Sequence, residues 1–281
     1  METSRLTREI QKSKIRVMYD LARTKEDVLN FTVGEPDFMT PKSIVEVSNR
    51  CFSEGYTKYT PNAGVPELLE AIAEKYEPVI GRKICAKSQV IVTVGATEAL
   101  LVAMQTVMDP GDEILICGPY FSSYINQVRI CHCKAVIVPT KEEDGWIPKV
   151  EEIEKRITPR TKMLLLNSPC NPTGAVMDEA SLRKIADLCM RYKIVVISDE
   201  VYKEIRYEEK EYFSIASIPG MEELTVIVNS FSKTYAMPGW RVGYAIGPEW
   251  IISQMPKTHD VLVACVCAPF QYAGAYALRK L

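Results

Sequence analysis

Short apolar runs rich in β-branched residues alternate with longer segments of helical periodicity between residues 90 and 246. Such short runs are typical of buried strands, and the segments between them are long enough for helices. Parallel strands need a crossover connection, which is usually a helix, so the alternation predicts a mainly parallel sheet with helices on both faces. The runs that we interpret as strands are residues 90–94, 113–117, 134–139, 162–166, 193–197 and 224–228.

A residue suited to ligand binding comes shortly after five of these runs. The five residues are Gly95, Phe121, Asn171, Asp199 and Lys233. In open α/β sheets, ligands bind outside the carboxyl ends of the strands. The shared position of the five residues therefore predicts a single site at that edge of the sheet.

Lys233 lies a few residues beyond the strand at residues 224–228, near the protein interior, where its ammonium group is poorly solvated. Desolvation lowers the pKa of a lysine, and the neutral amine is the form that makes a Schiff base with a carbonyl group. Ser230 and Ser232 precede the lysine and Arg241 follows eight residues later, so a phosphate group could bind beside an imine. The alternative is a surface lysine after a core strand.

Gly95, Ala96 and Thr97 form a glycine turn between the strand at residues 90–94 and a long helix. Backbone amides at a helix N-terminus point outward, and the helix dipole favours an anion there. We therefore interpret the turn as a phosphate cradle, to which Thr97 adds a hydroxyl group. Many strand-to-helix turns contain a glycine, so the interpretation depends on the presence of Lys233 elsewhere in the chain.

Two acids, Asp199 and Glu200, end the strand at residues 193–197. Burying a carboxylate is costly unless it is paired, and a protonated ring nitrogen would be a suitable partner. Tyr202 is three residues from Asp199 and could donate a hydrogen bond in the same site. The residues alone do not choose between the two acids, and a helix cap or a surface pair is the alternative.

Charge and composition exclude several classes of function. The 281 residues have a net charge of −2, which favours neither nucleic acid nor an anionic membrane as a partner. No apolar run reaches 18 residues, so no transmembrane helix is expected. The nine cysteines are scattered, and Cys131-His-Cys133 and Cys265-Val-Cys267 lack the spacing of a zinc site. We expect no metal, reduced thiols and a cytoplasmic protein.

The stretch Ser230-Phe-Ser-Lys233, followed by Gly239-Trp-Arg241-Val-Gly243, resembles the lysine-to-arginine signature of the class I/II aminotransferases. These are pyridoxal-phosphate enzymes of fold type I, such as the aspartate and aromatic aminotransferases. The resemblance extends from about residue 31 to the last residues, with the motifs in the family's order. It implies a mainly parallel seven-stranded sheet with helices on both faces, plus an incomplete small α/β domain. The implied divisions are an N-terminal arm (1–35), a large cofactor-binding domain (36–255) and the start of a small domain (256–281).

The resemblance also implies a role for each site residue. Lys233 would form the Schiff base, Asp199 would pair with the ring nitrogen, and Tyr202 would act with them in catalysis. Phe121 would stack on the ring, at a position where many relatives have tryptophan. The implied cofactor-binding residues are Gly95, Ala96, Thr97, Phe121, Asn171, Asp199, Tyr202, Ser230, Lys233, Arg241 and, from the partner subunit of a homodimer, Tyr59. The implied substrate-binding residues are Gly34, Asn171 and Phe121.

The activity implied by the resemblance is transfer of an amino group from an L-amino acid to a 2-oxo acid. Two alternatives remain, a pyridoxal-phosphate-dependent C–S β-lyase and a catalytically impaired, truncated cofactor-binding form. The second arises because the family continues beyond this point and includes an arginine that binds the substrate carboxylate, to which no residue here corresponds. Arg279 is too near the last residue to be assigned that role.

Local patterns give further expectations. Residues 1–29 have apolar positions at helical spacing, which predicts one N-terminal helix. Thr40 is expected to cap a helix that begins at Pro41, and Tyr124 is expected to pack. After residue 248, Pro256 and His259 are expected to interrupt a helical segment.

Overall fold

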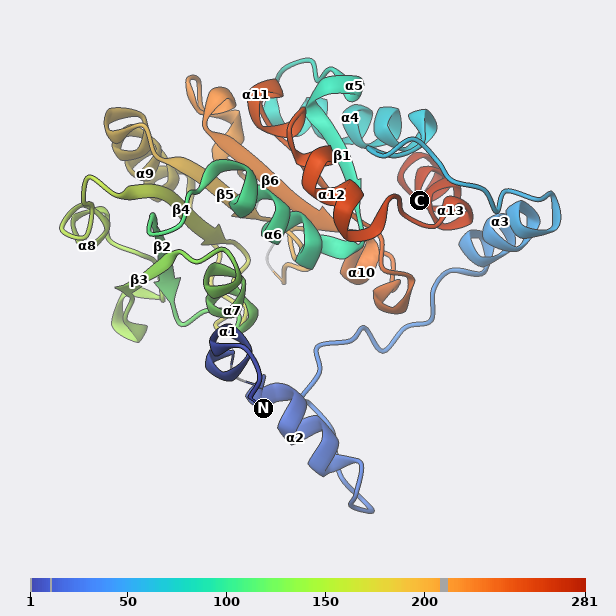
Figure 1. Ribbon diagram of the computed structural model, residues 1–281, viewed down its shortest axis with the longest axis horizontal. Coiled ribbons are helices and arrows are strands. Elements are labelled where there is room, and N and C mark those ends of the chain that lie inside the picture. Colours follow the sequence, from blue (N-terminus) through green and yellow to red (C-terminus); the bar gives the residue numbers. More distant parts are fainter. Residues whose placement is uncertain (1, 11, 208–211) are drawn as a thin grey trace.

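A computed structural model describes residues 2–10, 12–207 and 212–281. At its centre is a seven-stranded sheet in the order β1-β7-β6-β5-β4-β2-β3 (Figure 1). Paired strands are parallel except around β7, which runs antiparallel to β1 and β6. The predicted mainly parallel sheet is therefore confirmed. The strands are β1 (Val90–Thr93), β2 (Glu113–Gly118), β3 (Lys134–Pro139), β4 (Thr161–Asn167), β5 (Val195–Asp199), β6 (Thr225–Ser230) and β7 (Gly243–Ile246).

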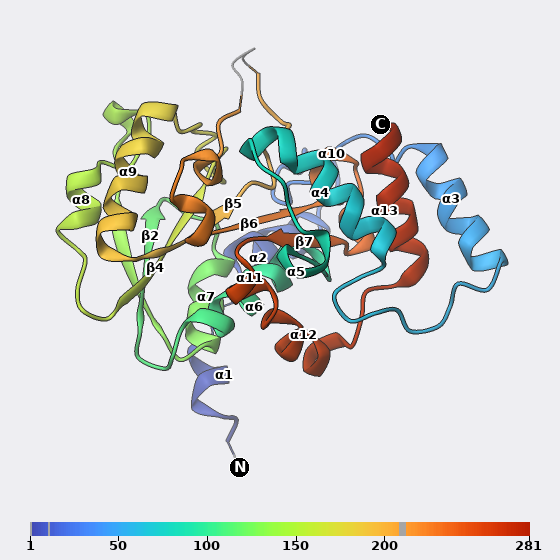
Figure 2. The same cartoon turned by 90° about the horizontal axis from the view of Figure 1, so that it is seen from above.

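Helices cover both faces of this sheet. In Figure 2, α4, α9 and α13 lie on one side of the strands, and α6, α7 and α12 lie on the other. The helices of the described residues are α1 (Arg5–Glu9), α2 (Lys14–Ala22), α3 (Lys42–Ser53), α4 (Pro66–Ile80), α5 (Ala86–Gln89), α6 (Gly95–Val107), α7 (Ser123–Ile130), α8 (Val150–Glu154), α9 (Glu179–Tyr192), α10 (Phe231–Thr234), α11 (Glu249–Ile252), α12 (Met255–Val263) and α13 (Ala268–Lys280). None of them is both long and apolar enough to cross a membrane.

Burial on both faces explains why the central strands appear as continuous apolar runs rather than as alternating patterns. In β2, Ile114 and Ile116 pack with the cluster that includes α6 and α7, whereas Leu115 packs with the cluster that includes α9. In β4, Leu165 packs with the first of these clusters and Leu164 with the second. Truncating such a buried leucine to alanine is expected to cost about 2–5 kcal/mol of stability.

Local signals set the ends of the two longest helices that cover the sheet. Pro66 occupies the first turn of α4, where a missing N–H costs nothing, and Gly81 ends the helix in the left-handed conformation. Asp178 caps α9, because its side chain accepts the backbone N–H of Ser181 at 2.7 Å. The buried faces of both helices then pack on the sheet.

The carboxyl ends of six strands meet at one edge of the sheet. Strand β7 alone among the seven runs the other way, and because β1 and β6 are both antiparallel to it, they share one direction. The turns after β1, β2, β4, β5 and β6 therefore lie along one edge. The five residues from which the sequence predicted a single site lie at or just beyond these strand ends.

The N-terminal segment, residues 2–10 and 12–39, does not form the single helix that was expected over residues 1–29. It contains two short helices, α1 and α2, that have no buried residues, and an extended stretch joins α2 to α3 (Figure 1). Positions 1 and 11 of the expected helix lie outside the described residues. The proposed division of the chain into arm, large domain and small domain stays a prediction.

Two local expectations are wrong. Thr40 does not cap α3; its hydroxyl donates to the carbonyl of Ala236, and Pro41 takes the capping position without a side-chain hydrogen bond. Pro256 and His259 do not interrupt a helix but lie within α12. Proline is tolerated in the first turn of a helix, so Pro256 marks the beginning of α12 rather than a break.

Candidate active site

Lys233 lies on α10, the one-turn helix that follows β6 directly. Its Nζ donates a hydrogen bond to the carbonyl of Gly34 and lies 5.6 Å from the ring centroid of Tyr202. Burial lowers the pKa of Lys233, Glu35 opposes this shift, and Arg241 adds to it. The lysine is therefore half-buried with a weakened preference for the charged form, as its place after a core strand predicts.

Asp199, the last residue of β5, is buried and hydrogen-bonded to Tyr124. The Tyr124 hydroxyl donates to Oδ2 of Asp199 at 2.7 Å, and the backbone N–H of Val201 approaches Oδ1 at 3.3 Å. Burial raises the pKa of Asp199 to about 6, although both hydrogen bonds act in the opposite direction. Tyr124 is buried in the core, as expected, and α7 also directs its hydroxyl group at this carboxylate.

The side chain of Glu200 has different hydrogen-bond partners from that of Asp199. Its Oε1 accepts the hydroxyl groups of Ser198 and Ser214, at 3.0 and 2.6 Å. Glu200 is fully buried, and burial raises its pKa. Of the two adjacent acids, only Asp199 is bonded to a residue of α7 beside the strand ends, so the geometry favours Asp199 as the site carboxylate.

Asparagines hold the loop after β4 against the end of β5. Asn167 donates through Nδ2 to the carbonyl of Asp199 at 3.0 Å and accepts the backbone N–H of Asn171 at 2.7 Å. The Asn171 side chain then reaches the Tyr202 hydroxyl, at a long 3.5 Å. Burial raises the pKa of Tyr202, and the nearby Asp199 adds to this rise. Tyr202 therefore stays protonated and can donate a hydrogen bond.

The phosphate cradle brings Gly95 and Arg241 together. Gly95 has a φ of +77°, and a Cβ at that position would lie 2.3 Å from Nη2 of Arg241. Gly243 is equally constrained, since its Cβ would lie 2.4 Å from the carbonyl carbon of Gly95. Both positions therefore require glycine, and the guanidinium group lies directly beside the turn.

Arg241 is exposed and makes no ion pair within the described part of the chain. Its Nη1 donates to the carbonyl of Pro238 at 2.9 Å, which orients the guanidinium group. Ser230 is buried and caps α10, where its Oγ accepts the backbone N–H of Ser232 at 3.3 Å. Thr97 is exposed at the first turn of α6, next to Ala96.

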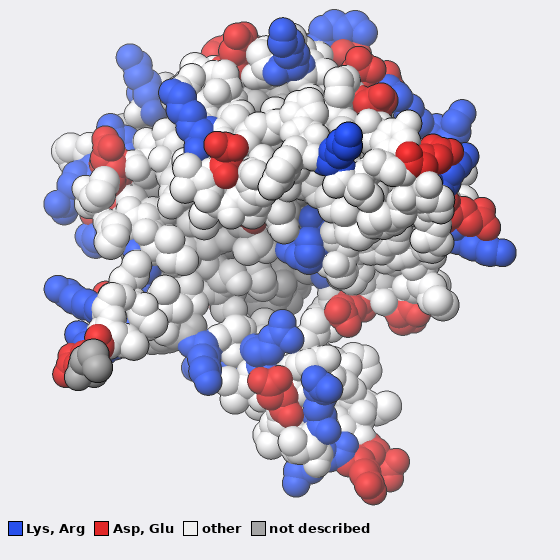
Figure 3. Space-filling model, turned by 45° about the vertical axis from the view of Figure 1, so that its right-hand side comes forward, with Lys and Arg blue, Asp and Glu red and all other residues white. Residues whose placement is uncertain are grey.

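Gly34 and Tyr59, two predicted site residues on other segments, differ in whether they lie near Lys233. Gly34 joins the cluster, because a Cβ at that position would lie 3.9 Å from both Lys233 Nζ and the Tyr202 hydroxyl. Tyr59 does not: its side chain is 89% exposed, on the loop before α4. Figure 3 shows a hollow between the arm and the body, with basic side chains near it and a largely uncharged floor.

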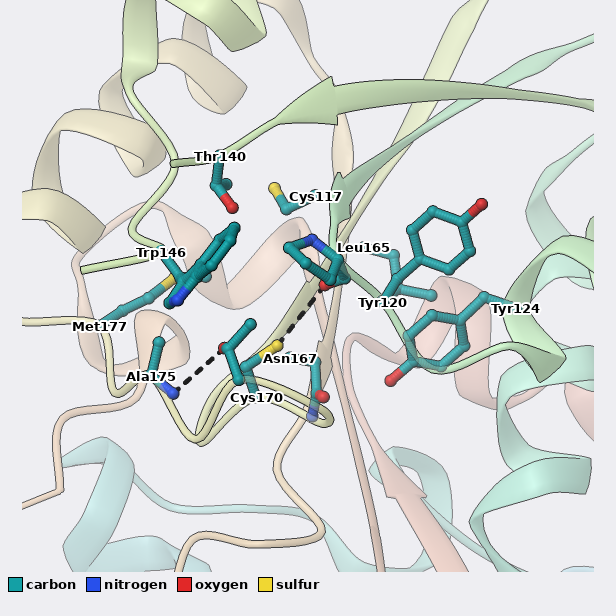
Figure 4. A pocket seen from close by; sticks show the side chains of 12 residues that line it. Cys117, Tyr120, Tyr124, Thr140, Trp146, Leu165, Asn167, Cys170, Ala175 and Met177 are labelled. Atoms are coloured by element: carbon teal, nitrogen blue, oxygen red, sulfur yellow. Dashed lines mark hydrogen bonds between the residues drawn. The ribbon is translucent and has the colours of Figure 1, made fainter. Parts of the chain in front are cut away.

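Phe121 lies after β2 and packs edge-on against Tyr124, with ring centroids 5.6 Å apart. Beyond Tyr124 is a cavity of about 20 Å³ that Asn167, Cys117 and Cys170 help to line (Figure 4). This volume holds about one water molecule. The cavity is therefore too small for a substrate.

Tyr124, Asn167 and Gly243 are site residues that the sequence analysis did not identify. Asn167 ends β4, so the rule that selected Asp199 at the end of β5 applies equally to it. Tyr124 lies one helical turn after Phe121, which is a weak signal. Gly243 has no signal beyond its presence in the lysine-to-arginine signature.

The site has the chemistry to hold pyridoxal phosphate. A glycine cradle that a Cβ would fill lies beside an arginine, at a helix N-terminus that favours anions. A half-buried amine and a buried carboxylate lie at the ends of the neighbouring strands β6 and β5. Phosphate, aldehyde and ring nitrogen thus each have a suitable partner, and the fold and site define an α/β enzyme of the pyridoxal-phosphate type.

Comparison with known proteins gives the family. Residues 26–280 match the model of the family described as aminotransferase class I and II. The chain belongs to this family, and it is a pyridoxal-phosphate-dependent aminotransferase. Aminotransferases of this kind use amino acids and keto acids as substrates.

Similar proteins include archaeal and bacterial aminotransferases. The chain is 43% identical to an aspartate aminotransferase of Pyrococcus abyssi over 96% of its own length and 69% of that relative. It is 40% identical to aromatic-amino-acid aminotransferase 2 of Thermococcus litoralis, with the same shares covered. The structure matches the aspartate aminotransferase of Thermus thermophilus with maleate at a TM-score of 0.95 and 38% identity, covering 100% of this chain and 73% of that one.

Proposed function

We propose that Lys233 is the residue that carries out amino transfer. The observation behind this proposal is the half-buried amine of Lys233, next to Tyr202 and the carbonyl of Gly34, at the shared edge of the strands. When bound, pyridoxal phosphate supplies an aldehyde that reacts with amino groups and a ring that accepts the electron pair released at the substrate Cα.

Asp199 and Tyr202 are proposed to set the protonation of the ring. The Asp199 carboxylate accepts the ring N–H, and Tyr124 orients that carboxylate from behind. Because an ion pair favours the charged form of a buried acid, the paired carboxylate stays ionised at neutral pH. Tyr202 and Asn171 donate to the ring oxygen, and Phe121 covers one face of the ring.

The phosphate group is proposed to bind to backbone amides at the start of α6 and to the side chains beside them. Gly95, Ala96 and Thr97 contribute the first turn of the helix, whose amides have no intrahelical partner. With the cofactor bound, Arg241 would hold the phosphate group through its guanidinium N–H donors, and Ser230 would donate a hydrogen bond from its hydroxyl group. These contacts fix the cofactor, so that Lys233 is directed at the reacting carbon.

Once an amino acid replaces it, the freed Lys233 amine acts as general base and then as general acid. It would take the proton from the substrate Cα and hold it on Nζ for return, which is the proton movement that amino transfer requires. Burial lowers the pKa of Lys233, which keeps part of the amine neutral for this task. Gly34 and Asn171 line the substrate side.

We propose a homodimer in which Tyr59 completes the phosphate site of the partner. Tyr59 is 89% exposed and makes no side-chain hydrogen bond to the described residues, and the N-terminal segment exposes apolar side chains such as Phe31 at 89% and Met39 at 91%. Exposed apolar groups gathered in one segment are typical of a surface that another chain covers. Sedimentation of the purified protein measures this directly, and a monomer with full activity would contradict the shared site.

For the substrates, the relatives named aspartate and aromatic aminotransferases support testing dicarboxylic and aromatic L-amino acids first. Purified protein with pyridoxal phosphate should show a visible absorbance band that an amino acid bleaches and a 2-oxo acid restores. The Lys233→Ala variant should lack both the band and the turnover. A colourless wild-type protein that does not respond to pyridoxal phosphate would end the proposal.

We also propose a cytoplasmic location. All nine cysteines lie in the described part of the chain as free thiols, and Cys51 and Cys189 among them are buried in the core. Reduced thiols are typical of the cytoplasm. Cell fractionation tests this proposal, and recovery of the protein with a membrane or secreted fraction would contradict it.

A further inference from the structure

A buried pair of side chains joins α12 to the phosphate cradle. His259 on α12 is 0% exposed, and its Nδ1 lies 3.0 Å from Oε1 of Glu98. Glu98 belongs to the first turn of α6, immediately after Thr97, and its Oε2 accepts the backbone N–H of Val94 at 2.5 Å. One carboxylate thus bonds both to α12 and to the residue at which the strand-to-helix turn begins.

Among the residues that the structure describes, Glu98 is the only hydrogen-bond partner of the His259 ring. A carboxylate only accepts hydrogen bonds, so Nδ1 of His259 is the donor. The other ring nitrogen, Nε2, has no hydrogen-bond partner among the residues that the structure describes. The imidazole ring is therefore oriented by one contact, and that contact leads to the cradle.

Loss of His259 would change the electrostatics of the cradle. Oε1 of Glu98 would become a buried acceptor without a partner, which is unfavourable. The carboxylate would also be less firmly held next to Thr97, close to the position of a phosphate dianion, and like charges repel strongly at such a site. His259 therefore holds the Glu98 carboxylate in one orientation beside the cradle.

The next residue of α12 has a separate contact. Asp260 accepts a hydrogen bond from Nδ2 of Asn62 at 2.9 Å, and the same Nδ2 lies 2.8 Å from the carbonyl of Ala264. Asn62 belongs to the loop that contains Tyr59, three residues earlier. Consecutive residues of one helix thus hold the cradle on one side and the Tyr59 loop on the other.

We propose that His259 and Asp260 are positioning residues for two different phosphate sites. His259, acting through Glu98, positions the cradle of its own subunit, and Asp260, acting through Asn62, positions Tyr59 for the site of the partner subunit. The inference rests on the proposed function, since it needs a dimer that exchanges Tyr59. Helix α12 then contributes separately to the phosphate affinity of each of the two active sites.

The first test separates binding of the phosphate group from general stability. Cofactor-free protein is titrated with pyridoxal phosphate and, separately, with pyridoxal, which lacks the phosphate group. His259→Leu fills space without a donor and should raise the Kd for pyridoxal phosphate about tenfold, equivalent to about 1.4 kcal/mol, with little change for pyridoxal. His259→Asn places an amide N–H near the position of Nδ1 and should restore most of the affinity. Competition with inorganic phosphate should show the same order.

A second variant shows whether the effect passes through Glu98. In a Glu98→Gln background the charge near the cradle is gone, so His259→Leu should then change the Kd for pyridoxal phosphate by less than about twofold. Thermal unfolding of each variant is measured in parallel. Equal losses for pyridoxal and pyridoxal phosphate, or an unchanged effect in the Glu98→Gln background, would overturn the role of His259.

Hybrid dimers test the role of Asp260. One subunit is wild type, and the other carries Lys233→Ala, so visible absorbance reports only on the wild-type site. Adding Asp260→Ala to the Lys233→Ala subunit should weaken pyridoxal phosphate binding at the wild-type site about fivefold, as expected for one lost hydrogen bond. Adding His259→Leu to that subunit instead should leave the wild-type site unchanged, and Asn62→Ala should reproduce Asp260→Ala.

The outcomes distinguish this inference from the proposed function. If wild-type protein binds no pyridoxal phosphate or forms no dimer, the proposed function fails. Suppose instead that the wild type binds the cofactor as a dimer. If His259→Leu and Asp260→Ala then act equally on the wild-type site of the hybrid, or if neither acts on any site, the roles assigned to the two residues of α12 are wrong and the proposed function still stands.

Discussion

The ring end and the phosphate end of the candidate active site are built in opposite ways. At the ring end, Asp199 is 6% exposed and is held by Tyr124 and Asn167, side chains on elements packed into the core. At the phosphate end, Gly95 offers backbone amides, and Arg241 is exposed. The ring end thus controls charge through burial, whereas the phosphate end controls affinity through backbone shape. Substitutions should separate accordingly into effects on kcat and effects on cofactor binding.

The largest difference between the effect on kcat and the effect on cofactor affinity is expected for Asp199→Asn. Loss of the carboxylate removes the group that keeps the ring nitrogen protonated, so kcat should fall by about 10²–10³. The Kd for pyridoxal phosphate should change by less than about tenfold, because the phosphate contacts remain. Steady-state kinetics and a cofactor titration measure both quantities. An Asp199→Asn variant that loses cofactor affinity and keeps its kcat would contradict the division between the two ends of the site.

Gly95→Ala should have the converse effect. A Cβ there would meet the Arg241 guanidinium group at 2.3 Å, and the φ of +77° is strained for alanine. The Kd for pyridoxal phosphate should rise about 10–100-fold, through roughly 1–3 kcal/mol of backbone strain together with the displaced arginine. Enzyme saturated with cofactor should retain most of its kcat.

Gly111→Ala is the matched control for Gly95→Ala. Gly111 has a φ of +93°, but nothing lies within 4 Å of its added Cβ. It should lower the unfolding temperature and leave cofactor affinity unchanged. Equal losses of affinity in the two variants would show that strain alone explains the effect.

Tyr124→Phe should give a smaller change at the ring end. The tyrosine hydroxyl lowers the pKa of Asp199, so its removal lets burial raise that pKa further. We expect about a tenfold loss of kcat at neutral pH, from one lost hydrogen bond to a charged group. The acid limb of the pH–rate profile should also move to higher pH. An unchanged profile would mean that Tyr124 only packs.

The smallest effect concerns the stability of cofactor-free protein. Burial raises the pKa of Asp199 from an ordinary 3.8 to about 6, so the folded protein binds more protons than the unfolded chain between these values. This contribution to stability is complete below about pH 4 and is lost as the pH rises through about 6. Between these pH values the unfolding temperature of the wild type should fall as the pH rises. The unfolding temperature of Asp199→Asn should depend less on pH. Parallel curves would contradict the assignment.

The strand-end residues were predictable because direction along a parallel sheet is fixed by its connections. Apolar runs gave the strands, helices between them required parallel pairing, and Gly95, Asp199 and Lys233 then had to lie at one edge. Burial of Lys233 followed from its place after a core strand. These inferences depend only on local pattern and on general rules of topology.

Contacts between distant segments were not predictable from local pattern. The Tyr124 hydroxyl reaches Asp199, 75 residues away, because of how α7 packs on the sheet. Thr40 bonds to Ala236 rather than to its own helix, because a tertiary partner replaced the local one. His259 was interpreted as part of a break, although its role depends on Glu98, 161 residues earlier.

The central claim is that the amine of Lys233 holds the cofactor. Protein incubated with pyridoxal phosphate is reduced with borohydride, digested and mapped by mass spectrometry. We expect the label on Lys233 and its loss in Lys233→Ala. A label on another lysine, such as the buried Lys203, or no label on a protein that binds the cofactor, would contradict it.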